Sequence, residues 1–277
     1  MQVFFCQNLQ SFIKKQRSLI WYKQGMRKMN PLILGLILCA SMALADDATH
    51  ITPTESQRQW SISGGMNRYT ESLMQLSGPE VGVHARWSGL EHLPHWQLEG
   101  DVLLGLQRYT SQDSGSMRQV GNIETRWRGL YPVYPAGQDN EGLSAGLALH
   151  TLWNDLRGKT TTNNVGYERE AVQLWLPLRW TGANAWTWEG AVLLRGRHTS
   201  RLSEVRSTYT DIHNTQKSGM YLQATTRFDL EDGTTLSPFV RFTRLGNSDH
   251  VPMGGSYWVE PKSQRWQIGA VWQFSPN

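Results

Sequence analysis

The sequence predicts an all-β protein, a transmembrane up-and-down antiparallel β-barrel of about ten strands that follows a cleavable signal peptide. Three observations predict this fold. Apolar and polar residues alternate with a period of two in ten segments. The stretch after residue 45 has no apolar run long enough for a spanning helix. Aromatic residues gather near the segment ends. We expect the barrel to occupy residues 58–274.

The N-terminus has the order of a secretory signal peptide. The basic pair Arg27-Lys28 precedes a short apolar stretch, and Ala43-Leu44-Ala45 then offers a small-residue cleavage site before two acids. We expect residues 29–45 to be the signal peptide, residues 1–28 a leader extension or a mis-set translation start, and residues 46–57 a periplasmic segment.

The basic pI of about 9.1 belongs to this leader. Residues 1–45 hold six basic residues and no acid, so their removal changes the formal net charge from +4 to −2. Charge therefore gives no support to nucleic-acid binding. Both cysteines, Cys6 and Cys39, also lie in the leader. The remaining chain has no thiol for a disulfide or a Cys-based metal site, and we expect neither a metal nor a cofactor.

Each of the ten segments has one apolar face, which we expect to meet lipid. In the sixth segment, for example, Val172, Leu174 and Leu176 alternate with the polar Gln173. The apolar faces extend over residues 60–66, 81–87, 96–106, 123–127, 143–153, 172–180, 186–194, 220–228, 236–242 and 266–274.

The connections between segments favour a barrel over a two-sheet sandwich. Connections at 89–94, 132–142, 181–184 and 231–233 are mostly short, whereas those at 70–79, 109–117, 155–166, 199–215 and 246–257 are mostly longer and polar. Short turns at one rim and long loops at the other are typical of outer-membrane barrels. An even strand number also leaves both termini on the short-turn side, so we expect periplasmic termini and extracellular long loops.

Aromatic residues are expected to form a girdle at the short-turn rim, because amphipathic rings favour the interface between membrane and water. A smaller set, which includes Tyr69, Tyr109 and Trp153, falls at the opposite rim. The predicted girdle residues are Trp60, Trp87, Trp96, Trp127, Trp180, Trp186, Trp188, Trp272 and Phe274.

The opposite face of the strands carries many charged residues, which we expect to point into the lumen. Ten strands leave a bore little wider than its side chains, so buried charges at this density must pair or be hydrated. They would form either a network that plugs the barrel or an arginine-lined path for small anions. The predicted lumen residues are Glu99, Asp101, Glu124, Glu189, Arg86, Arg126, Arg128, Arg169, Arg179, Arg195, Arg197, Arg227, Arg241 and Arg265.

Two short motifs suggest hydrolytic activity. Asp211-Ile212-His213 resembles the Asp-x-His pair of omptins, which are ten-stranded outer-membrane proteases. The resemblance implies an acidic pair on the opposite rim, for which only Asp113 or Asp155 is available, each without an acidic neighbour. The alternative interpretation is a solvated pair in a loop.

His198-Thr199-Ser200 resembles the His-x-Ser arrangement of outer-membrane lipid A deacylases and phospholipases. On a strand, two such residues share a face, so a base could reach a nucleophile. The Asn and Gly residues that surround the family motif are missing here. The alternative interpretation is a pair of polar residues at a strand end.

A broader resemblance covers the second half of the barrel. Residues 166–170, Leu176-Pro177-Leu178, residues 214–219, residues 238–242 and Val259-Glu260-Pro261 are similar to those of a group of small Gram-negative outer-membrane barrel proteins. The segment 265–274 also resembles the C-terminal strand that the outer-membrane assembly machinery recognises, although three residues follow it. The resemblance implies the fold and no catalytic residues.

The expected function is therefore that of an integral outer-membrane barrel with a structural or surface-interaction role. A narrow anion-preferring channel is the first alternative, and an omptin-like or deacylase-like hydrolase is the second. The expected partners are outer-membrane lipid, lipopolysaccharide and the assembly machinery, with no nucleic acid.

Overall fold

The computed structural model describes residues 57–93, 95–134, 141–253 and 256–274. The predicted signal peptide and leader lie outside the described residues, as do residues 275–277. The elements are β1 (Gln57–Thr70), β2 (Met74–Ser88), β3 (Gln97–Ser111), β4 (Gly115–Tyr134), β5 (Gly142–Lys159), β6 (Val165–Thr181), β7 (Trp186–Ser200), a 3₁₀ turn η1 (Leu202–Glu204), β8 (Ile212–Gln216), β9 (Gly219–Thr226), β10 (Phe228–Asp229), β11 (Thr235–Leu245), β12 (Val251–Met253), β13 (Ser256–Trp258) and β14 (Ser263–Gln273).

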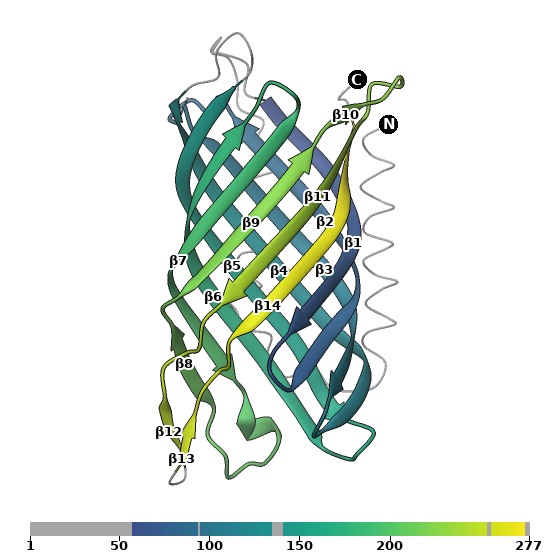
Figure 1. The fold of residues 1–277 in the computed structure, drawn as a ribbon, viewed down its shortest axis with the longest axis vertical. Helices are drawn as coiled ribbons and strands as arrows, with labels where there is room; N and C mark the ends of the chain where they lie inside the picture. Colours follow the sequence, from purple (N-terminus) through teal and green to yellow (C-terminus); the bar gives the residue numbers. More distant parts are fainter. Residues whose placement is uncertain (1–56, 94, 135–140, 254–255, 275–277) are drawn as a thin grey trace. The chain divides into compact units, whose positions relative to one another are not determined.

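The sheet closes on itself as an antiparallel barrel of ten strands (Figure 1). Strands β1 to β7 pair in chain order, and β14 closes the cylinder by pairing with β1, with Ser61 opposite Gln273. The eighth strand is divided into β8, β9 and β10, of which β9 bridges β7 and β11. The predicted strand number and topology are confirmed.

The outer face of the barrel is apolar and exposed. Exposed fractions reach 60% at Val81, 62% at Leu106 and 60% at Ile268, each on the face that the alternation predicts. Such a face would be costly in water, and it is the face that a barrel presents to lipid. The chain therefore has the fold of a transmembrane β-barrel.

The inner face is polar and buried, whereas the interior of a water-soluble protein is mainly apolar. Glu99, Asp101 and Arg126 have exposed fractions of 5%, 3% and 2%. Among the described residues, buried polar and charged side chains outnumber buried apolar ones, which include Trp175 and Leu103. Small residues allow the strands to approach closely: a Cβ at Gly146 would lie 1.8 Å from the carbonyl oxygen of Gly129.

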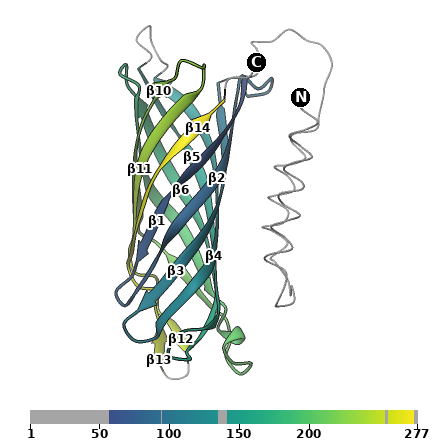
Figure 2. The same cartoon turned by 90° about the vertical axis from the view of Figure 1, so that its right-hand side faces the viewer.

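The prediction of five long connections at one rim is wrong for three of them. Strands β1 to β6 continue through most of the segments at 70–79, 109–117 and 155–166, so the connections shrink to 71–73, 112–114 and 160–164. The long connections that remain are β7–β8, which contains η1, and β11–β14, which contains the β12–β13 hairpin. Figure 2 shows this hairpin at the end of the barrel opposite β10.

The strands extend because their inward side chains build a small apolar core beyond the lipid-facing belt. Leu76, Val120 and Leu156 are buried together, and Tyr109 and Met117 pack against them. A strand of about ten residues is enough to cross a membrane, whereas β4 has 20 residues and β5 has 18. The surplus length forms a water-facing extension at the end that carries the two long connections, hereafter the loop end.

No helix in the described part of the chain is both long enough and apolar enough to span a membrane.

Candidate functional site

The middle of the lumen holds a network of ion pairs and hydrogen bonds, hereafter the lumen network. Its members come from seven strands and are all buried except Arg86. They are Glu80, Glu99, Asp101, Glu124, Glu189, Arg86, Arg126, Arg128, Arg179, Arg241 and Arg265.

One half of the network is centred on Arg128 of β4. Its guanidinium lies 3.0 Å from Glu99, 2.8 Å from Asp101 and 3.3 Å from Glu189, so it contacts three carboxylates from β3 and β7. Arg179 of β6 binds both oxygens of Glu99, at 2.6 and 2.7 Å. Two parallel N–H···O bonds of this kind fix the relative orientation of the two side chains and also pair their charges. Strands on opposite walls of the barrel are thereby joined through the lumen.

The second half lies on the β4, β14 and β2 side. Arg126 donates to Glu124 at 2.6 Å and to the amide oxygen of Gln267 at 2.7 Å. Arg265 lies 2.7 Å from Glu124, and Gln267 donates to Glu80 at 2.8 Å. Each guanidinium in this half has a carboxylate or amide partner, which offsets the cost of removing its charge from water.

An aromatic cluster packs beside the lumen network. The ring centroids of His150 and Trp175 lie 5.7 Å apart, and those of Trp175 and Tyr221 lie 5.4 Å apart. Trp175 is fully buried, and the Tyr221 hydroxyl donates to Glu189. The aromatic cluster and the lumen network together occupy the middle of the bore with tightly partnered side chains.

Two predicted lumen residues, Arg195 and Arg197, lie outside the lumen. The register of β7 against β6 shifts by one residue between the pairs Trp175–Leu193 and Leu174–Arg195. Beyond this bulge the facing of odd and even residues is exchanged, so Arg195 and Arg197 are exposed. A bulge inserts one extra residue and re-aims the side chains that follow, which uninterrupted alternation cannot show.

Arg227 also differs from the prediction. It lies between β9 and β10 at the rim that carries β10, where its side chain is 58% exposed and pairs with Asp229 at 2.7 Å. An exposed pair of this kind contributes little to stability. Arg227 is therefore a rim residue and takes no part in the lumen network.

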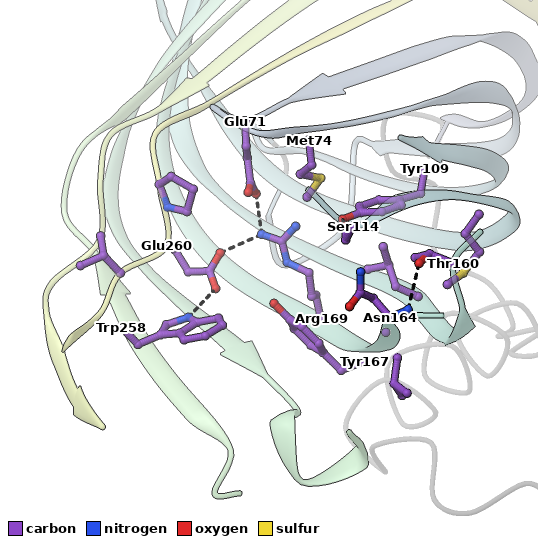
Figure 3. Close-up of a pocket in the computed structure, with 16 residues that line it drawn as sticks. Glu71, Met74, Tyr109, Ser114, Thr160, Asn164, Tyr167, Arg169, Trp258 and Glu260 are labelled. Carbon is purple, nitrogen blue, oxygen red and sulfur yellow. Dashed lines mark hydrogen bonds and ion pairs between the residues drawn. The ribbon is translucent and has the colours of Figure 1, made fainter. Parts of the chain in front are cut away.

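At the loop end the lumen opens into a pocket of about 250 Å³ (Figure 3). Tyr109, Tyr167 and Trp258 lie along its wall, and Arg169 lies between two carboxylates. Arg169 donates to Glu71 at 2.5 Å and to Glu260 at 2.7 Å. The mouth therefore presents aromatic faces around a fixed ion triad.

Glu260 gathers three further groups at this mouth. The Ser200 hydroxyl donates to it at 2.8 Å, the Trp258 indole N–H donates at 3.2 Å, and His198 Nδ1 lies at 3.1 Å. Burial raises the pKa of the Glu260 carboxyl, but the Arg169 guanidinium, the His198 ring and the Ser200 hydroxyl outweigh it and hold the pKa below its usual range. Glu260 is thus an anion that ties the β13–β14 connection to β6 and β7.

The bulge in β7 brings the predicted pair His198 and Ser200 inside, where both converge on Glu260. Ser200 is fully buried, and its hydroxyl donates to the Glu260 carboxylate. These groups hold a long connection in place.

Asp211 and His213 have separate partners. Asp211 accepts hydrogen bonds from the Ser203 backbone N–H at 3.1 Å and hydroxyl at 2.7 Å. His213 lies on the exposed face of β8, 3.0 Å from the Thr199 hydroxyl. Asp155, the candidate opposing acid, pairs with Arg157 at 2.8 Å. Within the described residues, no group of three or more His, Cys, Asp or Glu side chains could hold a metal ion.

The predicted girdle residues lie on the outer face toward the rim that carries β10. Trp60 and Trp87 meet edge to face with centroids 6.0 Å apart, and Trp186 and Trp188 stack at 5.9 Å. Exposed fractions include 50% for Trp188 and 51% for Phe274. The remaining members are Trp96, Trp127, Trp180 and Trp272, all exposed or half-buried.

Sequence reasoning missed several residues of the lumen and its mouth. Glu71 lies in the short connection 71–73, which the longer β1 places at the mouth of the lumen, whereas the sequence predicted a long polar loop there. Glu80 and Gln267 sit at inward positions of recognised segments, so strict alternation could have found them. Nothing in the alternation identifies Glu260, because it lies in an irregular connection.

No family model and no curated protein matches the chain. Among solved structures, it is similar to Neisserial surface protein A, with 9% identity over 79% of this chain and 98% of that one and a TM-score of 0.34. It is similar to the translocator domain of the autotransporter NalP from Neisseria meningitidis, with 11% identity, coverage of 87% and 95%, and a TM-score of 0.40. It is also similar to the β domain of the Bordetella autotransporter BrkA, with 16% identity, coverage of 79% and 99%, and a TM-score of 0.39. These TM-scores are too low to support an argument about the fold. The closed barrel is instead established by the strand pairing described above.

Proposed function

We propose that the protein is a closed, non-conducting barrel of the Gram-negative outer membrane whose role is carried by the surface of its loop end. The observation that carries the proposal is the lumen network. Arg128 and Arg179 bridge carboxylates from opposite walls, and Trp175 fills the adjacent space. A pore for solutes would need hydrated, unpartnered charges along its wall, and this lumen is instead packed with paired ones.

The location is supported by the outer face. Spanning structures in lipid must satisfy every backbone hydrogen bond internally, which a closed barrel does and an open sheet does not. The apolar belt and the aromatic girdle at one rim fit a bilayer. An even strand number leaves both termini at the same rim, and with that rim in the periplasm the loop end faces the exterior.

The loop end is the surface that fits an interaction role. It holds the pocket of about 250 Å³, the aromatic faces of Tyr109, Tyr167 and Trp258, and the two long connections. The pocket is built on strands and on the Arg169 triad, so it is preorganised. At the opposite rim, the connections 89–96, 182–185 and 230–234 are each shorter than β7–β8 and β11–β14.

A conductance measurement tests the proposal. The purified full-length barrel, reconstituted in planar bilayers, is expected to be electrically silent. Glu99→Ala combined with Glu189→Ala removes both carboxylate partners of Arg179 and two of the three of Arg128, and is expected to produce anion-selective current. The matched control Arg227→Ala combined with Asp229→Ala removes a pair at the rim and should stay silent. Steady single-channel current through the wild-type barrel would overturn the proposal and favour the channel alternative.

A further inference from the structure

Seven basic residues lie on the outside of the barrel toward the loop end, over β1, β3, β4, β7, the β8–β9 junction and β11, hereafter the basic collar. All are exposed, and all lie on outward-facing positions of strands or directly beside a strand end. They are Arg68, Arg108, Arg118, Arg195, Arg197, Lys217 and Arg244.

The collar begins where the apolar belt ends. On β1, Arg68 stands at the next outward position after Met66, which is 57% exposed. On β3, Arg108 stands at the next outward position after Leu106, which is 62% exposed. The guanidiniums therefore lie at the edge of the lipid-facing surface, at the depth where a bilayer changes from acyl chains to head groups.

The same transition occurs on β11 and on β7. On β11, Arg244 is the next outward residue after Phe242. On β7, the bulge places Arg195 directly after the exposed Leu194 and turns Arg197 outward as well. The bulge that removes these two arginines from the lumen thus adds them to the collar.

Neighbouring strands place some collar residues in one row. Arg68 is opposite Ser77, and Ser77 is opposite Arg108, so two guanidiniums flank a hydroxyl across β1, β2 and β3. Arg68 also donates to Gln75 at 3.0 Å. This row offers several N–H and O–H donors on one outward surface, and Arg118 follows on β4.

The collar lacks anionic partners of its own. Among the residues that the structure describes, no carboxylate forms an ion pair with any of its seven members. The sector over β5 and β6 differs. There Arg157 pairs with Asp155 at 2.8 Å, and Arg201 pairs with Glu170 at 2.7 Å. The barrel therefore neutralises its outward arginines in one sector and leaves them unpaired in the others.

We propose that the basic collar binds the phosphate groups of an anionic lipid in the leaflet at the loop end. A guanidinium presents a planar fork of donors that matches phosphate, and Arg supplies six of the seven collar cations. Lipid acyl chains would lie on the belt residues below, such as Leu106 and Phe242, while the phosphates meet the arginines. The inference rests on the proposed membrane location and deepens it by naming a lipid class.

The test measures lipid binding by the intact barrel in detergent micelles. Native mass spectrometry follows titrations with bis-phosphorylated lipid A, with its dephosphorylated form and with phosphatidylcholine. The wild-type barrel is expected to retain the bis-phosphorylated lipid at least about tenfold more tightly than the other two. Added salt should weaken that preference, because exposed charges are screened.

Two matched triple variants locate the site. Arg195→Gln with Arg197→Gln and Arg244→Gln should weaken binding of the bis-phosphorylated lipid by about tenfold or more. Arg157→Gln with Arg201→Gln and Arg206→Gln removes as many charges from the loop end without touching the collar, and should leave binding within about twofold. A gel that compares boiled and unboiled samples verifies that each variant is folded.

Equal binding of phosphorylated and dephosphorylated lipid by the wild-type barrel would overturn the inference, even if a collar variant failed to fold. An equal loss in both triple variants would overturn it as well. These outcomes are independent of the conductance test, because lipid retention in micelles does not depend on whether the lumen conducts.

Discussion

The arginines inside the barrel and those on the collar are the same residue type in opposite settings. Arg128 is 9% exposed and contacts three carboxylates, whereas Arg108, also at a strand position, is exposed and has no carboxylate partner. The side of the strand decides which setting an arginine enters. Charge alone therefore says little about a barrel arginine until its facing and its partners are known.

The two settings differ because water is excluded from only one of them. A buried guanidinium must be matched by carboxylates or amides, and removal of one partner leaves an uncompensated charge. An exposed guanidinium at a membrane edge stays hydrated and is free to meet another anion. The lumen arginines thus serve stability and closure, and the collar arginines are available for binding.

Cysteine labelling is expected to give the largest contrast, because it reports directly whether a side chain points outward or into the barrel. Residues 46–277 contain no cysteine, so single substitutions are unambiguous. Arg197→Cys should react with a water-soluble maleimide in the folded barrel, and Ser200→Cys should be protected until the barrel is unfolded. Labelling is followed by mass shift. Protection of position 197 together with reaction at position 200 would show that the bulge in β7 is absent.

Removal of a lumen arginine should cost far more stability than removal of a collar arginine. Arg128→Met leaves Glu99, Asp101 and Glu189 without a shared partner, and we expect a loss of about 3–5 kcal/mol in the free energy of unfolding. The matched change Arg108→Met should stay within about 0.5 kcal/mol. Urea titrations of the barrel in lipid vesicles measure both. Similar losses in the two variants would contradict the distinction.

At the loop end, the neighbours Ser200 and Thr199 repeat the contrast on a smaller scale. Ser200→Ala removes a buried hydrogen bond to the Glu260 carboxylate, with an expected loss of about 1.5–3 kcal/mol. Thr199→Ala removes an exposed bond to His213 and should change stability by less than about 0.5 kcal/mol. The same urea titrations apply. If Ser200→Ala were neutral while lipid A deacylation by the barrel disappeared, the serine would be a nucleophile rather than a structural donor.

The smallest expected effect is a pH dependence at Glu260. Its folded-state pKa is depressed below the ordinary value of 4.5, so its stabilising contribution is complete above that value. The contribution is lost as the pH falls from about 4.5 through the folded-state pKa. The stability difference between the wild type and Glu260→Gln should shrink as the pH falls below about 4.5. A difference that grew on acidification would contradict the depressed pKa.

Much of the barrel could be predicted because each segment is long enough for its alternation to be unambiguous. Val172, Leu174 and Leu176 could belong only to one face of a strand, and they are exposed as expected. The extended strands were missed because beyond the belt the apolar residues turn inward, as Leu76 and Leu156 do. The polar outward residues there resemble loop sequence, so the connections were predicted too long.

The sequence by itself determined the strand number, the lipid-facing side of the strands and the charges available to the lumen, since these follow from local periodicity and composition. Only the tertiary structure decided which charges meet. Arg128 and Glu189 are 61 residues apart along the chain, and Arg169 and Glu260 are 91 residues apart. Closure of the cylinder brings these pairs together, and one extra residue in β7 turns His198 and Ser200 inward. Both depend on pairing between strands rather than on the residues of any single strand.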